Sequence, residues 1–132
     1  MKRLGFALVL ITAHLAGCGS NATTYRGRLM VDGKPFIPTE GQMVQIQLLP
    51  DNSAESPVML GVDKKGLVSP VSAAGILPPG DYKVAIMAAD PAAMTKGKMT
   101  DQFKNAFSKD KTTLRLNIKP GANTHDIKVT TP

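Results

Sequence analysis

The chain has 132 residues, which is the size of one domain. Apolar residues make up 42% of it, which excludes a disordered polypeptide and predicts a packed core of mainly aliphatic side chains, because the chain has no Trp. The formal net charge is +6, and two of the 16 basic residues are Lys2 and Arg3.

Residues 1–18 differ in pattern from the rest of the chain. Two basic residues precede an apolar stretch at residues 5–13, which is too short to span ~30 Å of hydrocarbon but suits the helical apolar region of a signal peptide. The sequence Leu-Ala-Gly-Cys that ends at Cys18 resembles the lipobox of bacterial lipoproteins. The resemblance implies cleavage before Cys18, palmitate or related acyl chains on that residue, and a membrane anchor.

Cys18 is the only cysteine, so no disulfide is expected, and acylation removes a thiol that would be reactive in an oxidising compartment. Gly19 follows it, where an Asp commonly signals inner-membrane retention in Gram-negative lipoproteins. The resemblance therefore implies an exported, lipid-anchored protein of the cell envelope, in the outer membrane if the host is Gram-negative. The expected divisions are a signal peptide at 1–17, the lipidated Cys and a tether at 18–24, and a folded domain at 25–132.

From residue 25 onward, apolar residues alternate with polar ones, and turn-forming residues separate the alternating runs. Such alternation predicts strands with one buried face. We therefore expect an all-β fold, an antiparallel β-sandwich of about seven strands. The predicted inward residues are Leu29, Val31, Val44, Ile46, Leu48, Val58, Leu60, Val62, Tyr82, Val84, Ile86, Leu114, Leu116, Ile118, Ile127 and Val129.

One long connection interrupts this pattern. Residues 90–98 are expected to form a loop. Residues 101–107 predict a short helical turn, with Thr100 as its N-cap and with Phe103 and Phe107 on one face.

Four short motifs point to a family. The sequence GRLMVDGKP, from Gly27, is similar to the opening motif G-x-V-x-x-D-G-K-P of transthyretin-like, or carboxypeptidase-regulatory-like, β-sandwich domains. GVDKKG, from Gly61, resembles their G-x-T-D-x-D-G hairpin, and LPPGDYKV, from Leu77, resembles L-P-P-G-x-Y-x-V. IKPGANTHDI, from Ile118, resembles the closing V-K-x-G-x-N-x-x-x-I hairpin, whereas residues 67–70 match the family's pattern poorly. These motifs are turns and strand starts, so they imply a fold and not an activity.

The sequence offers no catalytic arrangement. His125 is the only His outside the signal peptide, and it lies beside Asp126 in a predicted terminal strand. No Ser stands in a G-x-S-x-G motif. We therefore expect no enzymatic activity and no cofactor.

Two metal sites are possible from the residue types, and each has a simpler alternative. The first hypothesis is a Ca²⁺ site, with oxygen ligands from neighbouring predicted loops: Asp51, Asn52 and Asp63. These residues lack the spacing of an EF-hand. Thioethers are soft ligands, so a Cu(I) site is the second hypothesis. Its alternative is that methionines fill gaps in a core with few aromatic residues. The Cu(I) set would be Met87, Met94, Met99 and His125.

Basic residues fall at positions opposite in phase to the inward residues, and so are predicted to face outward. If they share one face, they could contact an anionic glycan, lipid headgroups or an acidic protein, whereas nucleic acid is not expected. The alternative is that they keep exposed sheet faces soluble and edges unpaired. These residues are Arg26, Arg28, Lys83, Arg115 and Lys128.

Taken together, the sequence predicts a non-catalytic, lipid-anchored envelope protein. It would act in adhesion, as a scaffold, or as a binding module for protein or glycan. The alternative is a periplasmic protein that binds a soft metal such as copper, or a small ligand.

Overall fold

The computed structural model describes residues 22–71 and 77–132. The predicted signal helix, the cleavage site and Cys18 lie outside the described residues. Within them the chain forms strands and one four-residue helix, which confirms the expected all-β fold. Part of the predicted tether belongs to the fold, because Thr23 is buried and Thr24 is already in a strand.

The longest connection, residues 89–114, holds the one helix of the described residues. In chain order the elements are β1 (Thr24–Tyr25), β2 (Gly27–Val31), β3 (Lys34–Pro35), β4 (Val44–Pro50), β5 (Val58–Val62), β6 (Leu67–Pro70), β7 (Gly80–Ala88), α1 (Pro91–Met94), β8 (Arg115–Ile118), β9 (Ala122–Asn123) and β10 (Ile127–Val129). Strand β6 is thus a regular strand, although residues 67–70 match the family pattern poorly.

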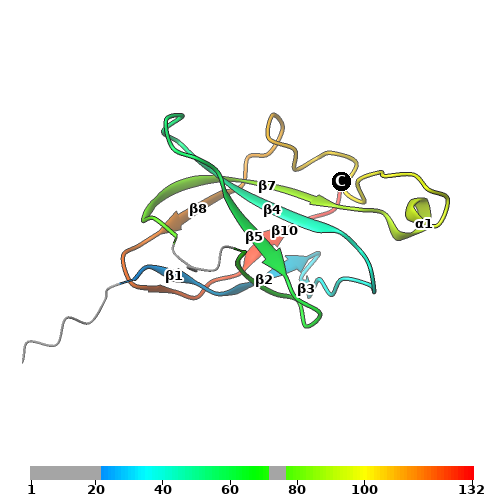
Figure 1. Ribbon diagram of the computed structural model, residues 1–132, viewed down its shortest axis with the longest axis horizontal. Helices are drawn as coiled ribbons and strands as arrows, with labels where there is room; N and C mark the ends of the chain where they lie inside the picture. Colours follow the sequence, from blue (N-terminus) through cyan, green and yellow to red (C-terminus); the bar gives the residue numbers. More distant parts are fainter. Residues whose placement is uncertain (1–21, 72–76) are drawn as a thin grey trace, which may run out of the picture.

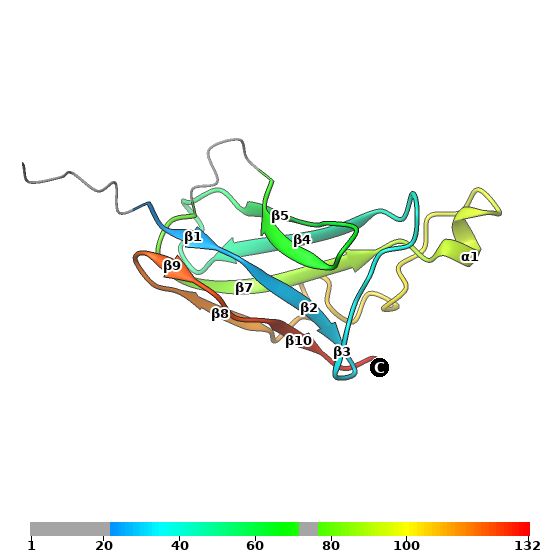
Figure 2. The same ribbon diagram turned by 90° about the horizontal axis from the view of Figure 1, so that it is seen from below.

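One curled sheet contains most of the strands, in the order β10-β2-β6-β5-β4-β7-β8, with β3 attached to β2. Strands β1 and β9 form a separate pair. In Figure 1, the β4, β5 and β7 strands lie above β1 and β2, and Figure 2 shows β1, β2, β9 and β10 from below. The curl encloses the core between these strands.

The sheet is not purely antiparallel, which corrects the sequence-based expectation. Strand β2 runs parallel to β10, and β1 runs parallel to β9, while the other pairs are antiparallel. These parallel pairs join strands from the two ends of the domain, which the curl of the sheet brings together in the same direction. The polar–apolar alternation carries no information on this pairing.

The predicted inward phase is confirmed. Most of those residues are buried in one cluster, and the rest, among them Val44 and Leu114, are half-buried against it. The Tyr82 ring is 1% exposed, and its hydroxyl donates a hydrogen bond to the carbonyl oxygen of Pro78 (2.7 Å). Burial raises the pKa of Tyr82, with a smaller contribution from the carboxylate of Glu55. The backbone partner offsets the cost of taking the hydroxyl out of water.

The closing strands meet at a position where only glycine fits. A Cβ on Gly27 would lie 2.1 Å from the carbonyl oxygen of His125 and 2.6 Å from the hydroxyl of Tyr25. That hydroxyl donates to the same His125 oxygen at 2.7 Å. Burial raises the pKa of Tyr25, and the nearby carboxylate of Asp126 raises it further. The opening glycine of the family-like motif therefore allows the chain segment before β10 to lie against β2.

The long connection differs from prediction in two places. The expected loop at 90–98 contains α1, because the Asp90 side chain caps the amide of Ala92 (3.0 Å) and Pro91 suits the first helical turn. The expected helical turn at 101–107 is a series of turns, because Lys104 and Asn105 have φ of 53° and 59°. Left-handed backbone ends a right-handed helix.

Candidate functional site

Strand β7 is longer than its partner β8, and another segment covers the remaining edge. Strand β8 pairs with β7 only from Gly80 to Lys83. Beyond that point, the amide of Val84 donates to the carbonyl of Leu114 (3.0 Å), and the amide of Ile86 donates to that of Phe107 (2.9 Å). The connection between α1 and β8 therefore folds back along β7 and closes its edge.

Asp101 organises this connection. Its Oδ1 accepts hydrogen bonds from the amides of Ala88 (3.1 Å) and Phe103 (3.2 Å), and its Oδ2 accepts one from the amide of Asn105 (2.9 Å). Phe103 is fully buried, and its ring meets that of Phe107 edge-on, with centroids 5.4 Å apart. The side chain that orders this segment is thus Asp101, and the N-cap role predicted for Thr100 is wrong because 101–107 does not form a helix.

The covered edge creates a hollow on the outer face of the sheet. On β4, Gln45 and Gln47 point away from the core, and their partners on β7 are Met87 and Ala85. Ala85 is 6% exposed although it lies in the outward phase. We call the space above these residues the outer hollow. It has a volume of about 200 Å³ and is lined by Gln45, Gln47, Ala85, Ile86, Met87, Asp101, Asn105, Phe107, Ser108 and Lys109.

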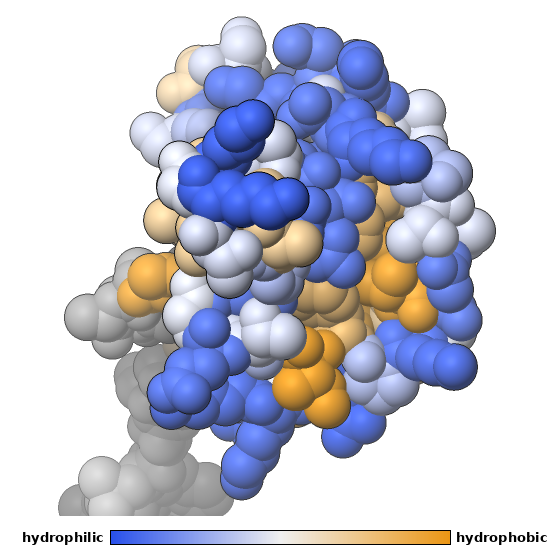
Figure 3. Space-filling view, turned by 90° about the vertical axis from the view of Figure 1, so that its right-hand side faces the viewer, coloured by the Kyte–Doolittle hydropathy of each residue, from blue (hydrophilic) through white to orange (hydrophobic). Residues whose placement is uncertain are grey.

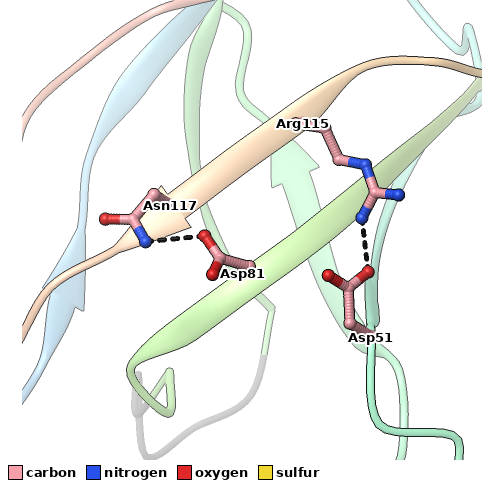
Figure 4. Close-up of polar contacts among 4 residues, drawn as sticks. All are labelled: Asp51, Asp81, Arg115 and Asn117. Carbon is pink, nitrogen blue, oxygen red and sulfur yellow. Dashed lines mark hydrogen bonds and ion pairs between the residues drawn. The ribbon is translucent and has the colours of Figure 1, made fainter.

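The same outer face is polar at its other end (Figure 4). Lys83 lies opposite Arg115 in the β7–β8 register. Arg115 forms an ion pair with Asp51, and the Asn117 amide donates to Asp81 at 2.7 Å. The Arg115 and Asp51 side chains are 60% and 57% exposed, so this pair contributes little to stability. It does reduce the free positive charge that Arg115 was predicted to offer.

The five predicted contact cations lie in two groups. Lys83 and Arg115 are neighbours on β7 and β8. The other three, Arg26, Arg28 and Lys128, are exposed on or beside β1, β2 and β10. In the sheet order, β6, β5 and β4 separate β2 from β7. The sheet register therefore does not bring all five cations together.

The hypothetical copper ligands are also dispersed. His125 is exposed and meets the ring of Tyr25 edge-on, with centroids 5.4 Å apart, beside β1. Met94 ends α1, which lies at the opposite end of the long axis from β1 in Figure 1. The structure therefore separates His125 from Met94, and the four-ligand set is not assembled.

The candidate calcium ligands are separated as well. Asp51 directly follows β4, and Asp63 directly follows β5. Because these two strands are antiparallel, the two residues lie at opposite ends of the pair. The Asp63 carboxylate accepts hydrogen bonds from the amides of Lys65 and Leu67 (both 2.8 Å) in the turn that Gly66 completes with φ 77°. In residues 22–71 and 77–132, no three His, Cys, Asp or Glu side chains are grouped as a metal site would require.

The end of the molecule that carries α1 is mostly hydrophilic. Figure 3 shows small, separate apolar clusters there among polar side chains. Four large apolar side chains of the described residues are exposed: Ile37, Met43, Val71 and Met99. None of these lines the outer hollow.

The described part of the chain contains no helix with the length and apolar character needed to cross a membrane. Comparison of the chain with protein-family models, curated proteins and solved structures gave no match.

Proposed function

We propose that this chain is an exported lipoprotein of the cell envelope, anchored by lipid on Cys18, whose domain is a non-catalytic binding module for protein or glycan. The observation that carries the anchor is the sequence Leu-Ala-Gly-Cys ending at Cys18, and the position of β1 indicates which end of the domain such an anchor would hold. Strand β1 begins at Thr24, at one end of the long axis, and α1 lies at the other end (Figure 1).

The short chain between the proposed anchor and the domain would keep one end of the domain near the bilayer. Only residues 19–22 separate Cys18 from the buried Thr23, and a chain of that length reaches at most roughly 18 Å when fully extended. A lipid on Cys18 would thus hold the β1 end near the bilayer. The outer face of β4 and β7, and the α1 end, would stay accessible to partners.

We also propose that the curled sheet is a β-sandwich of the transthyretin-like kind. Two observations support it. A single apolar core lies between the strands that the curl brings together. The family-like motifs also supply three structural positions: Gly27 where two backbone segments approach closely, Gly66 in a left-handed turn, and Tyr82 with its ring in the core. These are the places where the sequence resembles that family.

The anchor is tested by expressing the full chain and its Cys18→Ser variant in a bacterial host. We expect the parent in the membrane fraction, with a mature N-terminus at an acylated Cys18. Each buried CH₂ adds ~0.8 kcal/mol, so more than one acyl chain gives firm attachment. The variant should remain an unprocessed, unlipidated precursor. A parent whose mature N-terminus lies elsewhere, with an unmodified Cys18, would contradict the proposal.

The binding role is tested by photo-crosslinking in intact envelopes. A crosslinking residue at Lys109, which lines the outer hollow, should give adducts with a partner. The same residue at Thr130, exposed near the C-terminus, serves as the control. Equal labelling from both positions, or none from Lys109, would argue against a binding module that uses this face.

A further inference from the structure

The side-chain amides of this domain fall into two sets. Those of the first set are used inside the structure, where they hydrogen-bond to the backbone or to other side chains: Gln42, Asn52, Gln102, Asn117 and Asn123. The second set is Gln45, Gln47 and Asn105, whose side chains make no hydrogen bond within residues 22–71 and 77–132. All three of these line the outer hollow.

These three amides come from distant parts of the chain but meet at one place. Gln45 and Gln47 are two residues apart on β4 and so face the same side of the sheet. The connection brings Asn105 to the same hollow, where its backbone amide donates to Asp101 Oδ2 and its φ is 59°. Left-handed backbone at a residue other than glycine is held by the surrounding structure, and Asn tolerates this conformation better than most residues. The Asn105 side chain itself is exposed.

The rest of the lining is mostly apolar. Ala85, Met87 and the half-buried Phe107 contribute apolar surface. Ser108 and Lys109 also line the hollow. Asp101 also lines the hollow, but its carboxylate already accepts three backbone amides. A ligand would thus meet a mostly apolar surface, with three amides, a hydroxyl and one ammonium as the polar groups along it.

We propose that the outer hollow binds one saccharide unit of an envelope glycan. A side-chain amide both donates and accepts hydrogen bonds, as a sugar hydroxyl does, and the C–H face of a sugar ring can pack on Ala85, Met87 and Phe107. The volume of about 200 Å³ suits a single ring and is smaller than the ~300–1,000 Å³ of pockets for larger ligands. Lys109 favours a sugar that carries a carboxylate.

A peptide is the main competing ligand, and the edge of β7 argues against it. Extended peptides commonly bind by adding a strand to a free sheet edge. Here the amides of Val84, Ile86 and Ala88 already donate to the connection. A peptide would therefore lack the backbone partners that give this binding mode its affinity.

The inference rests on the proposed function, because it takes the domain to lie outside the cytoplasm, where envelope glycans are found. The test uses the full ¹⁵N-labelled chain in micelles of a detergent without a sugar headgroup. The probes are trimers of N-acetylglucosamine and of galacturonic acid, with trialanine as the peptide control. We expect saturable shifts of the side-chain amide signals of Gln45, Gln47 and Asn105, larger with the acidic sugar.

Matched variants separate the site from the rest of the surface. Asn105→Gly removes the amide and keeps a residue suited to φ 59°, and Gln47→Ala removes a second amide. Each should weaken sugar binding by about three- to tenfold, which corresponds to one lost hydrogen bond. Asn117→Ala, which removes an amide on the same face outside the hollow, should leave binding unchanged.

Three results would overturn the inference: no saturable shift with either sugar, equal binding by parent and variants, or shifts of the hollow with trialanine but not with sugars. Failure of the proposed anchor would be recognised separately, in the mass spectrum of the same sample, as a chain without acylation at Cys18.

Discussion

The Asp101 carboxylate accepts a hydrogen bond from the backbone amide of Ala88 at 3.1 Å, thirteen residues earlier in the chain. This bond ties the start of the irregular connection to the end of β7. The same carboxylate orders the turn that follows, through the amides of Phe103 and Asn105. One side chain therefore shapes both the edge of the sheet and a wall of the outer hollow.

Asp101→Ala should destabilise the domain by about 1–3 kcal/mol, because the amide of Ala88 loses its partner in a half-buried position. Urea denaturation of the parent and the variant measures the difference. Asp110→Ala, at an exposed position on the same connection, is the control and should change the free energy of unfolding by less than about 0.5 kcal/mol. Equal effects of the two substitutions would mean that Asp101 has no special role.

Gly27→Ala should destabilise the domain by about 1–3 kcal/mol or more, because the new methyl group would collide with the His125 carbonyl 2.1 Å away. Gly61→Ala is the matched control. There the nearest atom is a methyl group of the exposed Val71 at 3.3 Å, which can move aside. Thermal unfolding of both variants checks the ranking, and a more stable Gly27→Ala would refute the close approach of the closing strands.

Ile86→Asp should unfold the domain, because it places an unpaired carboxylate at a position that is 2% exposed in the core. Lys83→Glu, on the outer face of the same strand, should change stability by only about 0.5 kcal/mol. Circular dichroism with chemical denaturation distinguishes the two outcomes. Comparable small losses would show that the inward phase of β7 is misassigned.

The C-terminus should respond to acid through Asp32. The Thr131 hydroxyl (2.6 Å) and backbone amide (2.9 Å) donate to its carboxylate and hold the pKa of Asp32 below its ordinary value. A lowered folded-state pKa means that the contact is fully formed above the unfolded-state pKa and is lost as the pH falls through the lower, folded-state value.

The amide signal of Thr131, followed by NMR as the pH is lowered, should therefore titrate with a midpoint below that of a free Asp. Thr131→Val keeps the backbone amide but removes the hydroxyl, which is the larger cause of the shift. Its midpoint should move up toward the ordinary value. An unchanged midpoint in the variant would assign the low pKa to another contact.

The inward residues of the sheet could be predicted from the sequence because a strand with one buried face has a period of two. Residues such as Ile46, Leu60 and Val84 are accordingly buried. The parallel pairing of β2 with β10 could not be predicted, since residues such as Leu29 and Ile127 are brought into register by the whole path of the sheet.

The outer hollow could not be predicted from the sequence either, because it also depends on long-range folding. Gln45 and Gln47 have the pattern of ordinary solvent-facing strand residues, and they become part of a site only because residues 101–109 fold back over β7. The left-handed backbone at Lys104 and Asn105 has no reliable signal in these residue types, although Asn adopts it more readily than most. The one available hint was Asp101, a good capping residue at the start of the turn.

The parallel arrangement of β2 and β10 also determines how the domain would bear a load. If the N-terminal end is held at the membrane and the C-terminal end is pulled away, the two strands are drawn past each other along their length. Their hydrogen bonds, in register from Leu29 with Ile127 to Val31 with Val129, then share the force together and are not opened one at a time. The same pairing that closes the fold would act as a mechanical clamp between the two ends of the chain.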